Sequence, residues 1–137
     1  MTEENYPYTG LDGTCQNGTV THTNVNTTGF TGVIADDTDA MKSGLALQPL
    51  KVSIRASATC FQRYASGIFN NTKCGTQHNH ATLVVGWGIE AGVEYWIMKN
   101  SWGVTWGEQG YMRLQIIPGD GNCVIQMWPF YPNLWEY

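Results

Sequence analysis

Apolar and polar residues alternate most clearly in the C-terminal two thirds of the 137-residue chain. After Pro49, Val52 and Ile54 alternate with polar neighbours, which predicts a half-buried strand. The apolar run 81–88 predicts a buried strand, and residues 94–99 and 110–116 predict two more. Residues 89–93 contain Gly92 and connect the first two of these three strands, so we expect a hairpin.

The first fifty residues have a weaker pattern and are predicted to be rich in loops. Residues 6–13 contain turn signals, and residues 17–31 are almost all Thr, Asn and Gly. Short strands are expected around the apolar positions Val20, Val25, Phe30 and Val33.

Two helical segments and a C-terminal extension complete the prediction. Residues 36–47 predict a helix that Asp36 or Asp37 caps and that Pro49 ends, and residues 61–64 predict one helical turn. Residues 118–121 predict a turn, and Pro129 and Pro132 favour an extended end.

These elements predict one domain over residues 1–137, of the α+β class and mainly antiparallel β. We expect a twisted antiparallel sheet or half-open barrel with one short helix beside it. The composition agrees, since 16 glycines, 6 tryptophans and 7 tyrosines accompany only 13% charged residues.

Charge and hydropathy exclude several kinds of partner. The net charge of -4 and the seven basic residues form no cationic stripe, so nucleic acid is not expected. No apolar run approaches the roughly 18 residues of a membrane span, and the polar, acidic start does not resemble a signal peptide.

The cysteines and sequons bear on the compartment. None of the four cysteines lies in a C-x-x-C pair, so neither a metal site nor a cofactor is expected. Three N-x-[ST] sequons make Asn17, Asn26 and Asn70 candidate glycosylation sites. Together these features favour a secreted, vacuolar or lysosome-like compartment.

Candidate chemistry lies at the ends of two predicted strands. His80 opens the strand 81–88, where its imidazole is within reach of a substrate, and Asn100 follows the strand 94–99. A hairpin would place both at the same end of the sheet, where the amide oxygen of Asn100 can hold the imidazole N–H. Trp102 would cover this hydrogen bond. Taken singly, each residue also fits a structural role, as a buried histidine, a turn asparagine or an aromatic plug.

Together these residues resemble a known family. Asn79-His80-Ala81 and Lys99-Asn100-Ser101-Trp102-Gly103-Val104-Thr105-Trp106-Gly107 resemble the papain-like cysteine peptidases of the papain and cathepsin L group. Further matches occur in family order, among them Tyr6-Pro7-Tyr8, Phe61-Gln62-Arg63-Tyr64 and Phe130-Tyr131-Pro132. The resemblance implies the β-rich, barrel-like right-hand half of the papain fold.

The resemblance also implies roles for individual residues. His80 would be the catalytic base, Asn100 its orienting partner, Trp102 the shield and Trp106 a second aromatic wall residue. The substrate pocket would be lined by Ser53, His78, Asn79, Ala81 and Trp128. For Trp128, which would make that pocket shallow, a place in the ordinary core is an equal alternative.

The family nucleophile is missing from this chain. In the family it lies in a C-G-[SA]-C-[WY] motif about 130–150 residues before the histidine, hence roughly 50–70 residues before Met1. The oxyanion glutamine beside it is missing too. A partner segment or chain, the left-hand domain, would supply both. Met1 is either a true start or an internal residue of a precursor. The polar start and the unpaired Cys15 favour the second alternative.

The resemblance further implies a disulfide between Cys74 and Cys123, and a partner for Cys15 in the absent left-hand domain. Cys60 has no family counterpart, so a free thiol and a Cys15–Cys60 pair both remain open. Val124 replaces the glycine usual after Cys123, so the backbone there is expected to differ from the family's.

Three functions follow from these observations. The chain is expected to be part of a cysteine endopeptidase that is inactive without its other half. The alternative is an inactive, truncated relative that serves as a structural or binding subunit. A weaker reading is a secreted module that binds glycans or peptides through Trp102, Trp106 and Trp128.

Overall fold

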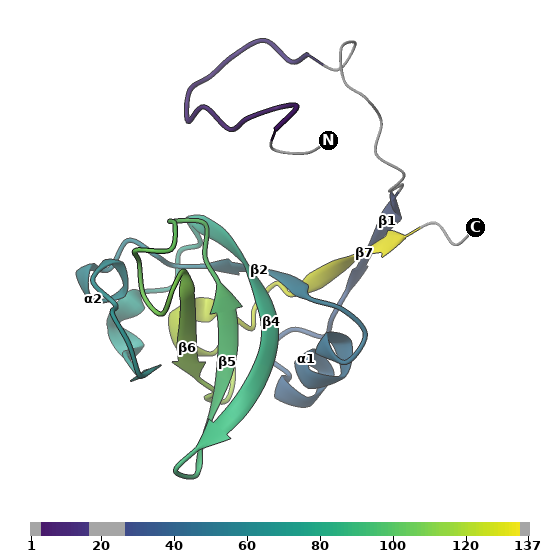
Figure 1. Cartoon of the computed structure of the whole chain (residues 1–137). Coiled ribbons are helices and arrows are strands. Elements are labelled where there is room, and N and C mark those ends of the chain that lie inside the picture. Colours follow the sequence, from purple (N-terminus) through teal and green to yellow (C-terminus); the bar gives the residue numbers. More distant parts are fainter. Residues whose placement is uncertain (1–3, 17–26, 135–137) are drawn as a thin grey trace. The chain divides into compact units, whose positions relative to one another are not determined.

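The alternating segments form a sheet with the strand order β1-β7-β2-β4-β5-β6-β3 (Figure 1). The computed structural model describes residues 4–16 and 27–134, except the side chain of Thr72. Within these ranges the strands are β1 (Thr27–Gly32), β2 (Leu50–Ile54), β3 (Ile68–Phe69), β4 (His80–Glu90), β5 (Val93–Lys99), β6 (Tyr111–Gln115) and β7 (Phe130–Leu134). The sheet is mainly antiparallel, as predicted. The predicted strands around Val20 and Val25 lie outside the described residues.

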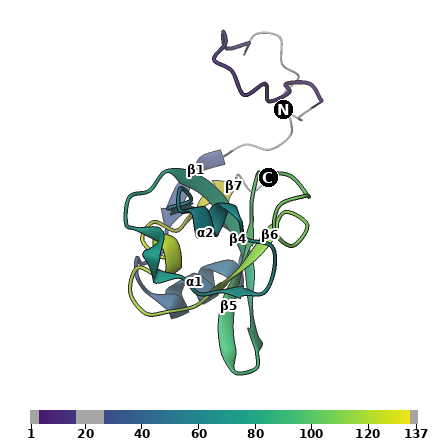
Figure 2. The same ribbon diagram turned by 90° about the vertical axis from the view of Figure 1, so that its left-hand side faces the viewer.

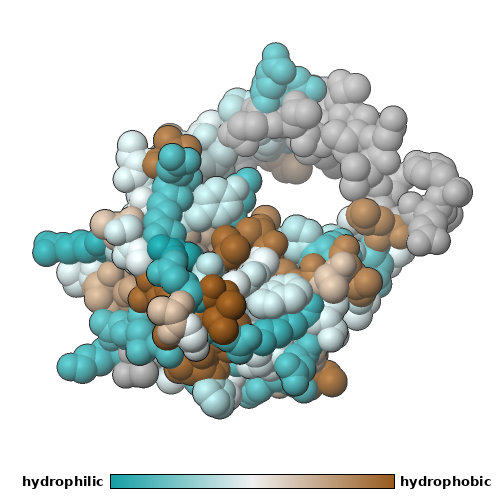
Figure 3. All heavy atoms as spheres, turned by 60° about the horizontal axis from the view of Figure 1, so that its bottom comes forward, coloured by the Kyte–Doolittle hydropathy of each residue, from teal (hydrophilic) through white to brown (hydrophobic). Residues whose placement is uncertain are grey.

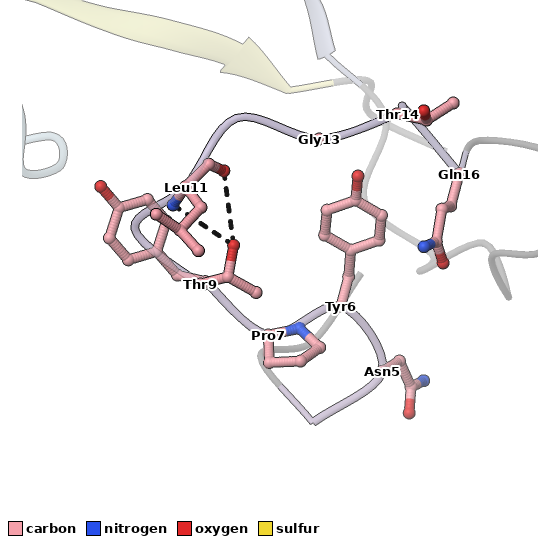
Figure 4. Close-up of a pocket in the computed structure, with 9 residues that line it drawn as sticks. Asn5, Tyr6, Pro7, Thr9, Leu11, Gly13, Thr14 and Gln16 are labelled. Atoms are coloured by element: carbon pink, nitrogen blue, oxygen red, sulfur yellow. Dashed lines mark hydrogen bonds between the residues drawn. The ribbon is translucent and has the colours of Figure 1, made fainter.

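The chain divides into two compact units, Met1–Gly29 with Pro132–Tyr137, and Phe30–Tyr131. In the first, the segment 5–16 folds back on itself around a hollow of about 390 Å³ (Figure 4). Thr9 holds this bend, since its hydroxyl lies 3.4 Å from both the N–H and the carbonyl oxygen of Leu11. The candidate site residues all belong to the second unit.

The predicted hairpin is confirmed. β4 and β5 pair antiparallel from Glu90 opposite Val93 to Leu83 opposite Lys99, and the turn residue Ala91 has a positive φ of 49°. The register shifts between Val84 and Gly86, where β4 carries a bulge. His80 is the first residue of β4, as expected, and Asn100 directly follows β5.

The central strands have one covered and one uncovered face. The covered face is the hydrophobic core, to which the strands contribute Leu50, Val52, Ile54, Val84, Trp96, Met98, Met112 and Leu114, all fully buried. Residues 81–88 form a strand as predicted, but the expectation that this strand is buried holds for one face only. Leu83 and Val85 are 41% and 37% exposed, because no element in the described part of the chain covers them.

We call the uncovered face of β2 and β4, with Lys51, Ser53, Ala81 and Leu83, the outer face. The register joins these residues in two rows, Ser53 opposite Ala81 and Lys51 opposite Leu83. Lys99 of β5 continues the second row beside Leu83. Residues from three strands that are far apart in sequence therefore form one surface.

The two helices lie on opposite sides of β4, β5 and β6 in Figure 1, and Figure 2 views these strands from one of the two sides. α1 (Thr38–Leu45) is shorter than the predicted 36–47, and Asp37 caps it by accepting a hydrogen bond from the Ala40 N–H at 2.9 Å. α2 (Thr59–Gln62) is the predicted helical turn moved two residues toward the N-terminus, with Phe61 buried in the core. Neither helix of the described residues is long and apolar enough to cross a membrane.

Three short elements were not predicted. β3 pairs parallel with β6, and the 3-10 turns η2 (Thr72–Cys74) and η3 (Asn122–Val124) hold the two halves of a disulfide. All three are too short to produce a periodic pattern. In Figure 3, the end of the sheet with the β4–β5 turn shows separate apolar patches between polar ones.

Candidate active site

The strand ends bring His80 and Asn100 together. The Nε2 atom of His80 lies 2.8 Å from Oδ1 of Asn100, and the Ser101 N–H donates to the same oxygen at 2.8 Å. A backbone N–H can bind only the oxygen of the amide, so the Ser101 contact fixes the orientation of the Asn100 side chain. Nε2 of His80 must then be the donor, which leaves Nδ1 as the proton acceptor of the neutral ring.

Trp102 lies flat on the imidazole of His80. The ring centroids are 5.2 Å apart and the planes differ by 27°. Two further aromatic residues contact the indole edge-on, Phe61 at 5.7 Å and Trp106 at 5.2 Å. Trp106 is itself anchored, because its Nε1–H donates to the carbonyl of Gln62 at 3.0 Å. The stacked ring therefore has little freedom to leave the histidine.

The loop after Trp106 depends on one glycine. Gly107 has a φ of 58°, and a Cβ there would lie 2.5 Å from the carbonyl oxygen of Tyr111. No other residue fits this bend without displacing β6. The bend turns Glu108 back toward β6.

Glu108 joins this loop to the rest of the sheet. It accepts hydrogen bonds from Nε of Arg113 at 2.9 Å and from the Gly67 N–H at 2.9 Å. The Arg113 guanidinium holds the pKa of Glu108 below its ordinary value, despite an opposing effect of burial. Burial also raises the pKa of Tyr64, which packs on Trp106 at 5.6 Å. The charged network thus supports the aromatic cluster from behind.

Asn79 fixes the approach to His80. Its backbone N–H donates to Ile54 at 3.0 Å, and its side-chain oxygen accepts from the Ala56 N–H at 2.8 Å. These two bonds tie the residue before the histidine to the end of β2. The side chain predicted to bind substrate therefore also has a positioning contact.

The remaining predicted pocket residues surround a shallow hollow of about 290 Å³. Its lining consists of Ser53, His78, Asn79, His80 and Ala81. Nδ1 of His78 lies 3.2 Å from the carbonyl oxygen of Ser53, so this nitrogen carries the proton of the neutral ring. The structure thus brings four of the five predicted pocket residues to the edge of His80.

Trp128 does not line this hollow. Its ring stands edge-on to His78 with centroids 6.4 Å apart, and it borders a second, apolar hollow of about 350 Å³ with Phe30, Val33, Met127 and Phe130. Trp128 is 63% exposed, so the alternative of an ordinary core residue is wrong. It stands behind the wall that His78 forms.

The backbone before Trp128 keeps a conformation that suits glycine. Cys123 and Val124 have φ values of 53° and 60°, in the left-handed region that a β-branched residue rarely adopts. Val124 therefore adopts a backbone conformation that glycine would adopt more readily.

Cys74 and Cys123 form a disulfide across 49 residues, with Cα atoms 5.0 Å apart. Cys15 and Cys60 are free thiols. Among the described residues no group of three or more His, Cys, Asp or Glu side chains could hold a metal ion. The sequons at Asn17 and Asn26 lie outside the described ranges, and Asn70 is exposed.

Sequence reasoning missed three contributors to this region. Phe61 supports Trp102, the Ser101 N–H orients Asn100, and Lys51 lies beside Ser53 on the outer face. The period-two pattern of β2 could have identified Lys51, since it places residues 51 and 53 on one face. Nothing in the sequence pattern identifies the other two contacts.

Comparison with known proteins supplies the family. The profile described as "Papain family cysteine protease" matches residues 1–133. The chain is 42% identical over 133 residues to cysteine proteinase COT44 of Brassica napus and 43% identical over 134 residues to vignain of Phaseolus vulgaris, each over 96% of its length. It spans only 40% and 37% of those two proteins.

Solved structures agree. Bromelain from Ananas comosus, bound to an inhibitor, matches with a TM-score of 0.87 and 38% identity over 98% of this chain and 62% of that one. The proform of Amb a 11, a ragweed pollen cysteine protease, matches with a TM-score of 0.90 and 34% identity over 98% of this chain and 37% of that one. The chain therefore belongs to the papain family of cysteine proteases.

Proposed function

We propose that this chain supplies the His/Asn half of a Cys-His-Asn site in a cysteine endopeptidase. The observation that carries the proposal is the contact of His80 Nε2 with Asn100 Oδ1, which leaves Nδ1 of His80 free to act as a base. The 137 residues would form the right-hand, β-rich domain of the enzyme.

In this proposal His80 moves the protons of peptide hydrolysis. Its Nδ1 takes the proton of a cysteine thiol, and the thiolate attacks the carbonyl carbon of the scissile peptide bond. The imidazolium then gives the proton to the leaving amine, and water later hydrolyses the acyl-enzyme. Asn100 keeps the ring in the required tautomer, and Trp102 and Trp106 exclude water from the Asn100 contact.

The nucleophile would come from a partner. None of the four cysteines stands in a C-G-[SA]-C-[WY] motif, and two of them form the disulfide. A left-hand domain, on another segment or chain, would bring the thiol and the oxyanion glutamine. The exposed apolar residues Leu83 and Val85 support such a partner, since uncovered apolar surface favours association.

The hollow beside His80 would receive a side chain of the peptide substrate. Ser53, His78, Asn79 and Ala81 would line it, and Trp128 would support the His78 wall from behind. We further propose a vacuolar, lysosome-like or secreted location, supported by the disulfide and the exposed sequon at Asn70, with Asn17 and Asn26 as further glycan sites.

The test compares the pure chain with the chain combined with a segment that carries the C-G-[SA]-C-[WY] motif. The pure chain should hydrolyse no peptide, and the assembly should hydrolyse peptides and be labelled by a thiol-directed epoxide at the motif cysteine. Turnover by the pure chain would contradict the proposed division of the site. A stable but inactive assembly would favour the alternative of a structural or binding subunit.

A further inference from the structure

Lys51 lies on the outer face next to the hollow beside His80, and with Ala81 and Leu83 it lines a neighbouring hollow of about 310 Å³. Its ammonium donates to Oγ of Ser53 at 2.5 Å and lies 4.7 Å above the centre of the Phe130 ring. Ser53 lines the hollow. Two neighbours in different strands therefore hold a positive charge next to the place proposed for a substrate side chain.

No carboxylate of the described residues neutralises this charge. Their ion pairs involve only Lys42 and Arg113, both with glutamates. Lys99, which lies beside Leu83 in the same row as Lys51, also lacks such a pair. The five residues that line the hollow include no acid. The outer face is thus locally cationic in a chain whose net charge is -4.

The donors at Lys51 and Ser53 suit a carboxylate. An ammonium has three N–H donors, and Lys51 uses one of them in its hydrogen bond to Ser53. The ammonium also makes a cation–π contact with the ring of Phe130. The Ser53 hydroxyl accepts from Lys51 and so keeps its own O–H to donate. A carboxylate oxygen at this point would receive one hydrogen bond from each.

We propose that Lys51 is a specificity-determining residue that favours an acidic side chain, Asp or Glu, in the hollow bounded by Ser53 and Ala81. This inference rests on the proposed function and adds its substrate class. Lys51 contacts no reacting atom, so it acts on the choice of peptide and leaves the bond-breaking step to His80.

The test uses the chain assembled with its nucleophile-bearing half and peptides that differ only at the residue seated in the hollow. Lys51→Met keeps the apolar stem and removes the charge. We expect the kcat/KM ratio of Glu over Leu peptides to fall about five- to tenfold in Lys51→Met and to be kept in Lys51→Arg. Lys42→Met removes an ammonium of α1 that pairs with Glu94 of β5, and it should leave the ratio unchanged.

An unchanged ratio in Lys51→Met, or a wild-type preference for Leu, would overturn the inference. So would weaker association of the two halves without a change in the ratio, because Lys51 would then face the partner.

A second measurement separates this inference from the proposed function. The isolated chain is titrated with acetylated glutamate amide and leucine amide, and the backbone amide shifts of Ser53 and Ala81 are followed by NMR. Shifts with the glutamate compound that disappear in Lys51→Met support the inference even if the assembly proves inactive. No difference between the two compounds counts against it.

Discussion

Two histidines line the same hollow and each packs against a tryptophan, yet the two pairs are built differently. Trp102 lies flat on His80 and is held by Phe61 and Trp106. Trp128 stands edge-on to His78, is 63% exposed and follows a backbone with two left-handed residues. The first pair is held by two further aromatic rings although Trp102 is 38% exposed, as the catalytic role proposed for His80 requires. The second has room to vary, as a residue that selects among substrates can.

The largest difference between the two pairs is expected in the kinetic effects of replacing each histidine. In the assembled enzyme, His80→Ala should lower kcat about 10³-fold, because the base is removed. His78→Ala should lower kcat/KM less than about tenfold and change the preferred peptide instead. Steady-state kinetics on both variants checks this. Equal losses of activity in both variants would contradict the proposed difference between the two histidines.

The supports of the two tryptophans should differ in stability. Phe61 is fully buried, so Phe61→Ala should lower the free energy of unfolding by about 3–5 kcal/mol. Because Trp128 is largely exposed, Trp128→Ala should lower the free energy of unfolding by less than about 0.5 kcal/mol. Urea unfolding followed by far-UV circular dichroism measures both. A large loss in Trp128→Ala would show that the second pair is as firmly built as the first.

Acid should weaken the first pair specifically. The lowered pKa of Glu108 means that its contribution to stability is present above the ordinary value of 4.5 and is lost as the pH falls through the folded-state pKa. Glu108→Gln should therefore be less stable than wild type by about 1–2 kcal/mol at pH 7. The difference should vanish near pH 2–3. Urea unfolding midpoints of both proteins between pH 2 and pH 7 test this pH dependence. A stability difference that stays constant with pH would contradict the prediction.

The smallest expected effect concerns the backbone before Trp128. Glycine is usually less stable than alanine in ordered structure, by about 0.5–1 kcal/mol. At Val124, with a φ of 60°, this order should reverse. The free energy of unfolding of Val124→Gly should exceed that of Val124→Ala by about 1 kcal/mol. Both variants lose the two γ-methyl groups of the buried valine, and glycine loses the Cβ as well, so the loss of apolar contacts alone would favour alanine. Thermal unfolding of the two variants gives the comparison.

The sequence predicted what depends on periodicity or on a local motif. The β4–β5 hairpin follows from two apolar runs with Gly92 between them, and it places His80 and Asn100 at one end of the sheet. The support of Trp102 by Phe61 joins residues 41 positions apart, and no local pattern records such a contact. Leu83 and Val85 were expected to be buried because apolar composition alone does not tell which face has a cover.

The bond between the Asn79 side chain and the Ala56 N–H has a further use. A backbone hydrogen in such a bond exchanges with solvent only when the bond opens. The exchange rate at Ala56 therefore reports how often the end of β2 parts from the segment that leads into His80. It can be measured by NMR on the isolated chain in heavy water, with no substrate and no nucleophile. Slower exchange after assembly would mean that the partner stiffens this junction, a change that kinetics alone would not reveal.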